Sequence, residues 1–309
     1  FHAQDAIRDC LLSRGLGDVY KRQTMNQFKR FQESLKLEYV EDNKFTVNPD
    51  TNYFVGSTPH GGYLMAIMHK ALTSILPHST AISSSVQYLD RIDAKPFELE
   101  VESFKVSRGS SSGIVRLRQD DKVCTTFTGT CSDFEFMKGY DDLQKPLPDI
   151  FTEKDKNDYV KMNYDKISKG FTPSFIQQLE CLIHPDHAWW NRDTDTKSKD
   201  NNARCSAFLE MEGGQPDQFC LSFYSDILPP VVCNKYGPLG WIPTITLTTH
   251  IRQLPTTNQL YADFIATDIN KGYFEQDCNI WDLNGNLVAS SRQLTRILKS
   301  EEKLSKITN

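Results

Sequence analysis

One carboxylate in this sequence lies among apolar residues, where a buried charge is destabilising, and it is the first candidate for a catalytic group. Asp226 lies in the apolar run 219–228, FCLSFYSDIL, which we expect to form a helix that ends before Pro229. An unpaired buried carboxylate is strongly destabilising, so such a group is paired or has a function. The alternative is an Asp on the exposed face or in the last turn of this helix. We expect Asp226 to accept a proton or to orient a water molecule.

Two consecutive glycines mark a second place that can support chemistry. Gly61 and Gly62 stand at the expected start of another helix, with Thr58 as its N-cap and Pro59 in its first turn. Free backbone N–H groups at a helix N-terminus favour negative charge and can polarise an acyl carbonyl. Close packing of helix and sheet explains the glycines equally well. His60 beside them is a candidate ligand contact, although a lone histidine is more often structural.

Two further patterns suggest chemistry that their surroundings do not support. The segment 109–113, GSSSG, fits the G-x-S-x-G pattern of a serine hydrolase, but that motif needs a helix after it. An alternating, strand-like segment follows instead, so a hairpin turn explains the pattern better. His184 and His187 lack a third ligand in a recognisable register, and we expect no metal there. That segment precedes two tryptophans and is expected to form a turn and an aromatic wall of a pocket.

The order of the predicted elements repeats along the chain. The first copy has one helix, 58–75, with apolar residues at helical spacing, followed by strands with alternating apolar residues. Those strands are expected at 84–89, 97–104, 113–119 and 123–130. The second copy has strands at 175–183 and 206–211, and then the helix 219–228. Four more strands are expected at 244–252, 260–267, 272–282 and 287–298, with Asn284-Gly285 as a hairpin turn.

This repeat predicts two similar units. In each unit one helix faces an antiparallel sheet, which can wrap the helix and bury its apolar stripe. Two units placed side by side would form a continuous sheet with the active groove between the helices. We expect an N-terminal unit at 25–137, a charged, turn-rich linker at 138–170 and a C-terminal unit at 171–309. Residues 1–24 lack periodicity and resemble translated sequencing adapter, so we treat them as a non-native leader.

From about residue 45 to the C-terminus, the chain resembles the double-hotdog acyl-CoA thioesterases of type II, which belong to the thioesterase-like superfamily. The segments that carry the resemblance are His60-Gly-Gly-Tyr, Val86-Gln-Tyr-Leu-Asp-Arg, Phe223-Tyr-Ser-Asp226, Pro243-Thr-Ile-Thr-Leu-Thr-Thr-His and Asp282-Leu-Asn-Gly-Asn-Leu-Val-Ala-Ser-Ser-Arg-Gln293. Each segment is short, but their order and spacing are specific when taken together with the repeat. The resemblance implies an α+β double hotdog, in which two antiparallel sheets each wrap a central helix.

The resemblance also implies a catalytic trio. Asp226 matches the carboxylate that activates the attacking water, Thr244 a hydroxyl on the strand after the helix, and Gln293 an amide on the last strand. Alone, Thr244 and Gln293 would be an ordinary strand residue and a solvated amide. Together, the three groups can hold one water that attacks a thioester carbon without a covalent intermediate, a metal or another cofactor. The substrate-binding residues that we expect are His60, Gly61 and Gly62.

The expected activity is hydrolysis of an acyl-CoA to free acid and CoA, and two alternatives compete with it. Enoyl-CoA hydratases of the hotdog fold pair an Asp with a His five residues on, but Val231 stands five residues after Asp226. The second alternative is a non-catalytic hotdog protein that binds acyl-CoA. A retained trio indicates capacity for catalysis and not its rate, so the sequence leaves this alternative open, as it does the length of the acyl chain.

Composition excludes several other classes of protein. The 309 residues are 39% hydrophobic and carry a net charge of −5, so no basic field attracts nucleic acid or an anionic membrane. The sequence lacks an 18-residue apolar run that could span a membrane. Eight scattered cysteines without a CxxC motif favour reduced thiols, and the cytoplasm is the expected location. Proteins of this fold often associate through sheet edges, but no motif here decides whether the chain forms a homo-oligomer.

Overall fold

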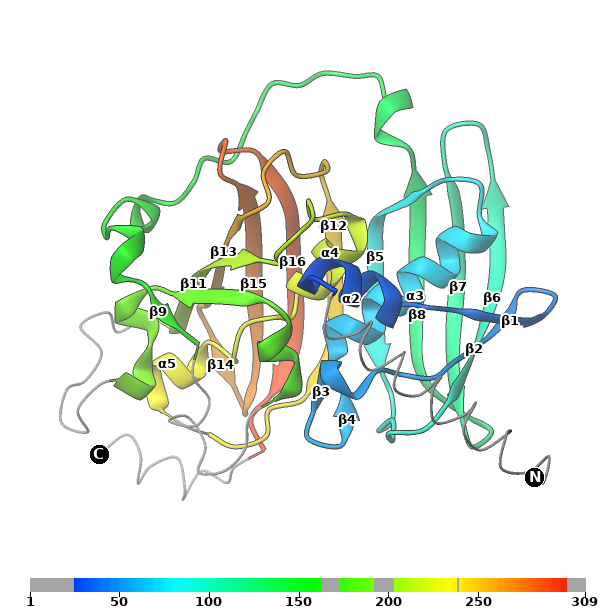
Figure 1. The fold of residues 1–309 in the computed structure, drawn as a ribbon, viewed down its shortest axis with the longest axis horizontal. Coiled ribbons are helices and arrows are strands. Elements are labelled where there is room, and N and C mark those ends of the chain that lie inside the picture. Colours follow the sequence, from blue (N-terminus) through cyan, green and yellow to red (C-terminus); the bar gives the residue numbers. More distant parts are fainter. Residues whose placement is uncertain (1–24, 163–172, 192–202, 238, 299–309) are drawn as a thin grey trace, which may run out of the picture.

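The computed structural model describes residues 25–162, 173–191, 203–237 and 239–298, which form two halves (Figure 1). The strands of the first half are β1 (Glu38–Glu41), β2 (Lys44–Val47), β3 (Phe54–Val55), β4 (Thr58–Pro59), β5 (Thr80–Tyr88), β6 (Phe97–Val106), β7 (Ser111–Gln119) and β8 (Lys122–Ser132). Those of the second half are β9 (Val160–Lys161), β10 (Glu180–Ile183), β11 (Ala203–Glu210), β12 (Thr244–Ile251), β13 (Leu260–Ala266), β14 (Ile269–Asn270), β15 (Tyr273–Asp282) and β16 (Leu287–Arg296).

The helices are few and mostly short. The α-helices are α2 (Gln27–Ser34), α3 (Gly61–Ile75), α4 (Gln218–Tyr224) and α5 (Val232–Tyr236). The 3-10 helices are η1 (Thr51–Tyr53), η2 (Phe134–Phe136), η3 (Asp149–Phe151), η4 (Lys156–Asp158), η5 (Ser174–Gln178), η6 (Pro185–His187) and η7 (Trp189–Asn191). None of the helices in the described ranges is long and apolar enough to cross a bilayer.

One antiparallel sheet joins the two halves. In the described chain it has 14 strands, in the order β1-β2-β6-β7-β8-β5-β12-β16-β15-β13-β11-β10-β9, with β14 paired to β15. The halves meet where β5 pairs with β12, from Ser83 opposite His250 to Gln87 opposite Thr246. The expected pair of sheets is thus a single sheet, continuous across the boundary between the units. Pairing at this seam satisfies N–H and C=O groups that two separate sheet edges would leave exposed.

The first half has the predicted arrangement of a helix against a sheet. α3 packs on β5, β6, β7 and β8, and its residues from Gly62 to His69 are all buried. Alternate residues of the strands join the same core, such as Leu99 of β6 and Leu117 of β7. This period of two is what the sequence pattern predicted, because successive side chains of a strand point to opposite faces.

The described residues of the second half form no long central helix. α4 ends at Tyr224, four residues before the predicted end, and its neighbour α5 is a separate short helix. Pro229 and Pro230 lack N–H donors, and a residue that precedes a proline is disfavoured in the helical conformation. The expectation that Asp226 lies inside a helix is therefore wrong, because it lies in the turn after α4. α4 contacts β12 and α5 contacts β11, so two short helices cover this part of the sheet.

Two other element boundaries also differ from the prediction. Thr58 and Pro59 form β4, which pairs with β3, so Thr58 is not the N-cap of α3. His60 occupies that position, and its side chain makes no capping hydrogen bond. Of the strand predicted at 175–183, the first four residues belong to η5 and the last four form β10. In both places a tertiary contact or a tight turn replaces the regular element that local propensity favours.

The hairpin turn predicted at 109–113 is confirmed. The turn is formed by residues 107–110, which connect β6 to β7, and residues 111–113 are the first of β7. The hydroxyl of Ser111 is buried and lies 2.9 Å from Nδ1 of His78. No helix follows the serine, so the geometry of a serine hydrolase nucleophile is absent from this segment of the described chain.

The helix α2 crosses from the first half to the second. Gln32 Nε2 donates a hydrogen bond to Oδ2 of Asp217 at 2.9 Å, and the ring of Phe31 stacks on that of Phe223 at 5.2 Å. Asp217 is also the N-cap of α4. Figure 1 shows α2 lying beside α4. The helix that precedes the first unit therefore helps to hold α4, which leads directly into the turn of Asp226.

The segment between the halves packs on the outer face of the second half. Phe151 and Tyr159 join an aromatic cluster with sheet residues of β11, β13 and β15. Trp281 Nε1 of β15 donates a hydrogen bond to the carbonyl of Lys145 at 2.9 Å. From Lys145 onward the predicted linker thus contacts the sheet, whereas its first residues, 138–144, are exposed and 163–170 lie outside the described residues.

Candidate active site

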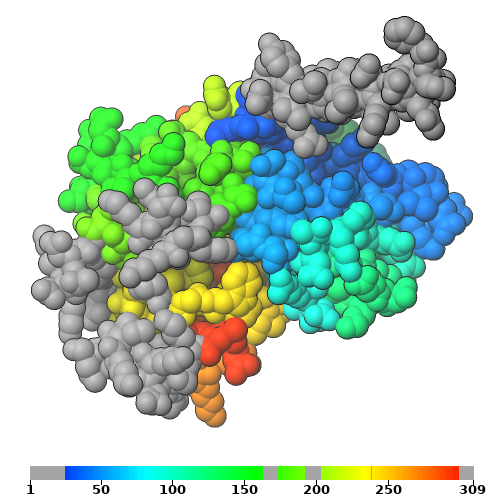
Figure 2. All heavy atoms as spheres, turned by 60° about the horizontal axis from the view of Figure 1, so that its bottom comes forward, coloured from blue at the N-terminus to red at the C-terminus, as the bar shows by residue number. Residues whose placement is uncertain are grey.

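A cavity of about 970 Å³ lies between the two halves. Its walls come from the β3–β4 hairpin, the start of α3, the end of β5, the turn after α4, and β12 and β16. Figure 2 brings this side of the molecule forward, where blue segments of the first half meet green and yellow segments of the second. The predicted site residues that line the cavity are His60, Gly61, Asp226, Thr244 and Gln293. The sixth, Gly62, adjoins it through a hydrogen bond to Asp226.

Asp226 presents its carboxylate to the start of α3. Oδ2 accepts a hydrogen bond from the Gly62 N–H at 3.1 Å, and the side chain is 13% exposed. The carboxylate thereby caps a helix of the other half, where the helix dipole favours negative charge. Burial disfavours the charged form and raises the pKa of Asp226 to about 7, against the opposing effect of the bond from Gly62. The group therefore exchanges its proton near neutral pH.

The two glycines allow the halves to approach each other closely. A Cβ on Gly62 would lie 2.5 Å from the carbonyl oxygen of Phe223, and a Cβ on Gly61 would lie 2.6 Å from Oδ2 of Asp226. The closest contacts that require glycine are therefore with α4 and the turn after it, and Gly61 is also closely approached by Tyr88 of the sheet, whose hydroxyl would lie 3.1 Å from a Cβ. The Gly62 N–H is taken by Asp226, whereas the Gly61 N–H opens α3 and has no acceptor within the helix.

His60 holds the turn of Asp226 in place. Its Nε2 lies 3.1 Å from the carbonyl oxygen of Asp226 and 3.6 Å from Oδ2. Because a carbonyl only accepts, Nε2 carries the proton. Burial lowers the pKa of His60 to about 4, so the contact with the carboxylate is not an ion pair at neutral pH. The ring packs at 4.3 Å from that of Phe175, which makes His60 a neutral support between the halves.

Thr244 and Gln293 reach the cavity from adjacent strands of the second half. β12 and β16 are antiparallel neighbours, with Gln293 directly opposite Leu247. Gln293 is 4% exposed, and its Oε1 has no hydrogen-bond partner within the described chain. Thr244 is half-buried at the start of β12. A buried carbonyl oxygen without a donor is destabilising, so Oε1 is a ready acceptor for an O–H or N–H group in the cavity.

Two polar residues of the first half line the same cavity, and the sequence analysis did not single them out as site residues. Tyr88 ends β5, and Thr125 lies opposite it on β8. The hydroxyl of Tyr88 donates to the carbonyl oxygen of Gly61 at 2.8 Å. Thr125 is fully buried, and its hydroxyl has no partner among the described residues. Tyr88 lies in the segment 86–91 that carries the family resemblance, and strand alternation was the sole signal for Thr125. Neither signal distinguishes a site residue from a core residue.

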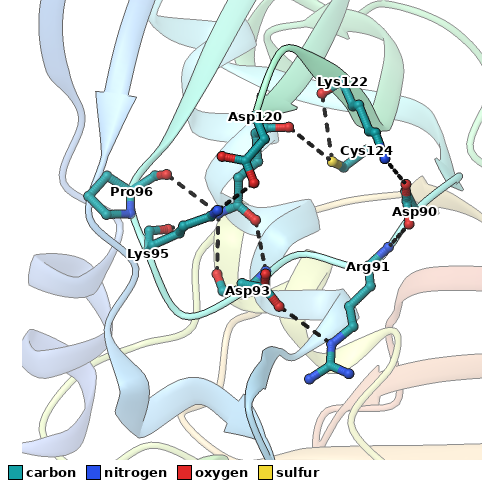
Figure 3. Close-up of polar contacts among 9 residues, drawn as sticks. Asp90, Arg91, Asp93, Lys95, Pro96, Asp120, Lys122 and Cys124 are labelled. Carbon is teal, nitrogen blue, oxygen red and sulfur yellow. Dashed lines mark hydrogen bonds and ion pairs between the residues drawn. The ribbon is translucent and has the colours of Figure 1, made fainter.

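One edge of the cavity is a charged turn that follows β5. Asp90 and Arg91 line the cavity, and Figure 3 shows them among several ion pairs. Arg91 Nη2 donates to Oγ of Ser57 at 2.6 Å, and its Nε lies 3.6 Å from Asp93. Lys122 lies 3.9 Å from Asp90. These pairs are exposed, so each adds little to stability, and their charges nearly balance.

A larger part of the lining is apolar and aromatic. Phe175 of η5, Trp189 of η7 and Trp241 line the cavity together with Leu228 and Leu239. Trp189 belongs to the segment from which an aromatic wall was expected, and it contributes one. An apolar wall beside a few convergent polar groups is typical of a pocket for a small molecule with a hydrocarbon part.

His184 and His187 do not line this cavity. Both are buried, their ring centroids are 4.9 Å apart, and Nδ1 of His187 accepts the N–H of Ser206 at 3.0 Å. In the described ranges, no group of three or more His, Cys, Asp or Glu side chains is placed to hold a metal ion. The two imidazoles pack with the strand β11 beside them.

Comparison with solved structures supports the fold. A hot dog fold protein of unknown function from Alicyclobacillus acidocaldarius is 20% identical, with a TM-score of 0.74 over 88% of this chain and 98% of that one. The acyl-CoA thioesterase II TesB2 of Mycobacterium marinum is 14% identical, with a TM-score of 0.65 over 88% of this chain and 98% of that one. An uncharacterised protein of Mycobacterium tuberculosis is 29% identical over 85 residues, which span 28% of this chain and 29% of that protein.

Family models match both halves. The acyl-CoA thioesterase N-terminal domain matches residues 49–132, and the acyl-CoA thioesterase C-terminal domain matches residues 153–297. The matched ranges contain the start of α3 and the turn of Asp226, which build the cavity together. The chain therefore belongs to the acyl-CoA thioesterase family and has its hotdog fold.

Proposed function

We propose that this protein hydrolyses an acyl-CoA to a free carboxylic acid and CoA, with a water molecule as the nucleophile. The observation that carries the proposal is the placement of the Asp226 carboxylate in one cavity with Gln293 and Thr244. Its raised pKa supports a role as general base near pH 7. The apolar part of the cavity suits an acyl chain, and no residue in the described lining fixes the length of that chain.

In the proposed reaction, Asp226 accepts one proton from the water while the water oxygen bonds to the thioester carbon. The water donates its other hydrogen to the free Oε1 of Gln293, and the hydroxyl of Thr244 donates a hydrogen bond to the water oxygen. The tetrahedral intermediate then collapses, the C–S bond breaks, and the CoA thiolate takes the proton that Asp226 had accepted, which restores the carboxylate. Because the Asp226 carboxylate activates the water and the water itself attacks the thioester carbon, the proposed reaction needs no metal and no covalent enzyme intermediate.

The developing negative charge on the carbonyl oxygen needs a donor, and Gly61 is the one we propose. Its N–H opens α3 and has no acceptor within the helix, and the residue lines the cavity. The N–H of Gly62 was an equal candidate in the sequence, but it already donates to Asp226. A preorganised donor at a helix N-terminus stabilises such charge more than a mobile water does.

The pH dependence of kcat/KM follows from the same carboxylate. Burial raises the pKa of Asp226 to about 7, and the general base must be unprotonated. We therefore expect kcat/KM to rise about tenfold per pH unit below pH 7 and to level off above it. Release of free thiol from an acyl-CoA, followed from pH 5.5 to 9, measures this profile. A flat profile down to pH 5.5, which a base with the ordinary pKa of an exposed Asp would give, would contradict the role of the buried group.

The two groups that hold the water are tested by separate substitutions. Gln293→Ala is expected to lower kcat by about 10–100-fold, and Thr244→Val by about tenfold, because the water loses a fixed orientation. The matched control is Thr246→Val, which changes a half-buried threonine on the same strand away from the cavity lining. Steady-state kinetics with one acyl-CoA measures all three. Equal rates for Gln293→Ala and the control would remove Gln293 from the mechanism.

The alternative function is that of a non-catalytic acyl-CoA-binding protein. A measurement of thiol release distinguishes it from a hydrolase. A panel of acyl-CoAs of different chain length would be offered to the full chain, with binding measured by calorimetry and CoA release by a thiol reagent. Tight binding of any member without release of CoA would favour the binding protein. Turnover that exceeds the spontaneous rate and depends on Asp226 supports hydrolysis.

We also infer a reducing compartment, with the cytoplasm as the proposed location. Free thiols are buried in both halves, at Cys124, Cys131, Cys181, Cys220 and Cys278. Proteins from oxidising compartments usually pair such cysteines in disulfides.

A further inference from the structure

One peptide unit links Tyr88 to Asp226. The hydroxyl of Tyr88 donates to the carbonyl oxygen of Gly61 at 2.8 Å, and the N–H of the same peptide, that of Gly62, donates to Oδ2 of Asp226 at 3.1 Å. We propose that Tyr88 is a positioning residue, which holds the Asp226 carboxylate through the peptide between Gly61 and Gly62. This inference rests on the proposed function, because it concerns the group that would activate the water.

The peptide needs such a support because it joins two glycines. Glycine restricts its backbone least, so the first turn of α3 does not by itself fix the direction of this N–H. The bond from Tyr88 fixes the carbonyl end of the peptide, and the N–H end points at the carboxylate as a result. Donation to the carbonyl also polarises the amide, which makes its N–H a stronger donor. Both effects favour the charged form of Asp226.

Tyr88 is suited to this role and unsuited to direct chemistry. Burial raises its pKa well above the usual value, and the charge of Asp226 adds to the rise. The phenol therefore stays protonated and serves as a permanent hydrogen-bond donor. Its position is set by the sheet, because Tyr88 pairs with Thr125 at the end of β5. A rigid strand thus holds a flexible helix start in a defined orientation.

The ionisable groups near Asp226 allow its titration to be identified in a pH profile of kcat/KM. His60 is the ionisable side chain in contact with the carboxylate, at 3.6 Å, and its pKa of about 4 keeps it neutral above pH 5.5. Thr244 and Gln293 face the cavity from β12 and β16 and do not titrate. Elsewhere in the lining, the titratable or charged side chains are Tyr88 of β5, Cys233 of α5, and Asp90 and Arg91 of the charged turn. An inflection near pH 7 that disappears in Asp226→Asn thus reports Asp226.

The test is Tyr88→Phe, which removes only the hydroxyl. We expect the inflection of kcat/KM to move upward by about 0.3–1 pH unit, because the carboxylate loses part of its stabilisation. We also expect kcat on the alkaline plateau to fall about 3–10-fold with KM nearly unchanged, since the base is less well oriented. The matched control is Tyr63→Phe. Tyr63 lies on α3 outside the cavity lining, and its hydroxyl donates a hydrogen bond to the carbonyl oxygen of Ser34. This control variant should not move the inflection.

A second variant reverses the sign and does not depend on how Tyr88→Phe folds. Fluorotyrosine at position 88 keeps the hydroxyl and makes it a stronger donor, so the inflection should move downward. Unchanged inflections in both variants would overturn the proposal, as would a shift of equal size in Tyr63→Phe. The pKa of Asp226 is also measured directly by ¹³C NMR of its carboxyl carbon, assigned with Asp226→Asn. That readout needs no turnover, so a shift by NMR without hydrolysis would contradict the proposed function and leave the link from Tyr88 intact.

Discussion

Asp226→Asn is expected to lower kcat/KM for acyl-CoA hydrolysis by about 10²–10⁴-fold, the range attributed to a general base. The amide keeps the size of the side chain, and its oxygen can still accept the N–H of Gly62, so the cavity retains its shape. What the variant loses is the ability to take a proton from water. Thiol release measured above pH 8, where the wild-type carboxylate is fully charged, gives the largest difference.

The same substitution is expected to stabilise the folded protein at high pH. The pKa of Asp226 rises from 3.8 in the unfolded chain to about 7 in the folded one, so the folded state favours the neutral form. This contribution to stability is fully present below pH 4 and is lost as the pH rises through 7. Asn stays neutral, so its advantage above pH 8 is about 2–4 kcal/mol. Urea unfolding at pH 4.5 and pH 8.5 measures it.

Activity and stability of Asp226→Asn, measured together, distinguish a catalytic role of Asp226 from a structural one. Loss of activity together with higher stability at pH 8.5 is expected of a buried base. Loss of both would mean that Asp226 mainly holds α3 to the turn after α4. Retention of wild-type activity would remove Asp226 from the mechanism altogether.

Gly62→Ala is expected to damage both stability and activity, because its Cβ has no space. The new atom would lie 2.5 Å from the carbonyl oxygen of Phe223, which is backbone and cannot rotate away. α3 and α4 must therefore separate, and such overpacking costs about 1–3 kcal/mol. The separation also moves the Gly62 N–H away from Asp226, so we expect at least about a tenfold fall in kcat/KM. Thermal unfolding and thiol release measure the two effects.

Two other glycines provide the controls. A Cβ on Gly61 would approach Oδ2 of Asp226, the tip of a side chain, so Gly61→Ala should displace the carboxylate and lose activity with a smaller loss of stability. A Cβ on Gly109 would meet no atom within 4 Å, so Gly109→Ala should change neither property. Equal stability of Gly62→Ala and Gly109→Ala would mean that the halves are not packed as closely as described.

The sheet was largely predictable because its signal is local. The strands expected at 97–104, 113–119 and 123–130 correspond to β6, β7 and β8, and alternate residues such as Val115 and Leu117 face the core. The helix ends were less predictable. The actual start of α3 depends on the pairing of Thr58 with Val55, and the end of α4 depends on how the chain accommodates Pro229 and Pro230. Such events depend on tertiary contacts that a single sequence does not display.

The residues of the candidate site were predictable from the sequence, but the hydrogen bonds that join them were not. The resemblance selected Asp226, Thr244 and Gln293, and the fold brings all three to one cavity, while their catalytic roles stay predictions. The bonds that join Tyr88, the Gly61–Gly62 peptide and Asp226 cross from one half to the other, so no spacing in the sequence encodes them. The expected unit boundaries stay predictions as well. The leader assigned to residues 1–24 lies outside the described residues.

The docking of α2 on α4 fixes an order of events during translation. Gln32 and its partner Asp217 are 185 residues apart. At a synthesis rate of about 5–20 residues per second, α2 leaves the ribosome roughly 10–40 s before α4 exists. Over that interval Phe31, which is fully buried in the finished protein, has no ring of Phe223 to pack against. The first of the described helices thus completes its native contacts late, and a nascent chain stalled before residue 217 would lack the contacts of Gln32 and Phe31 with α4.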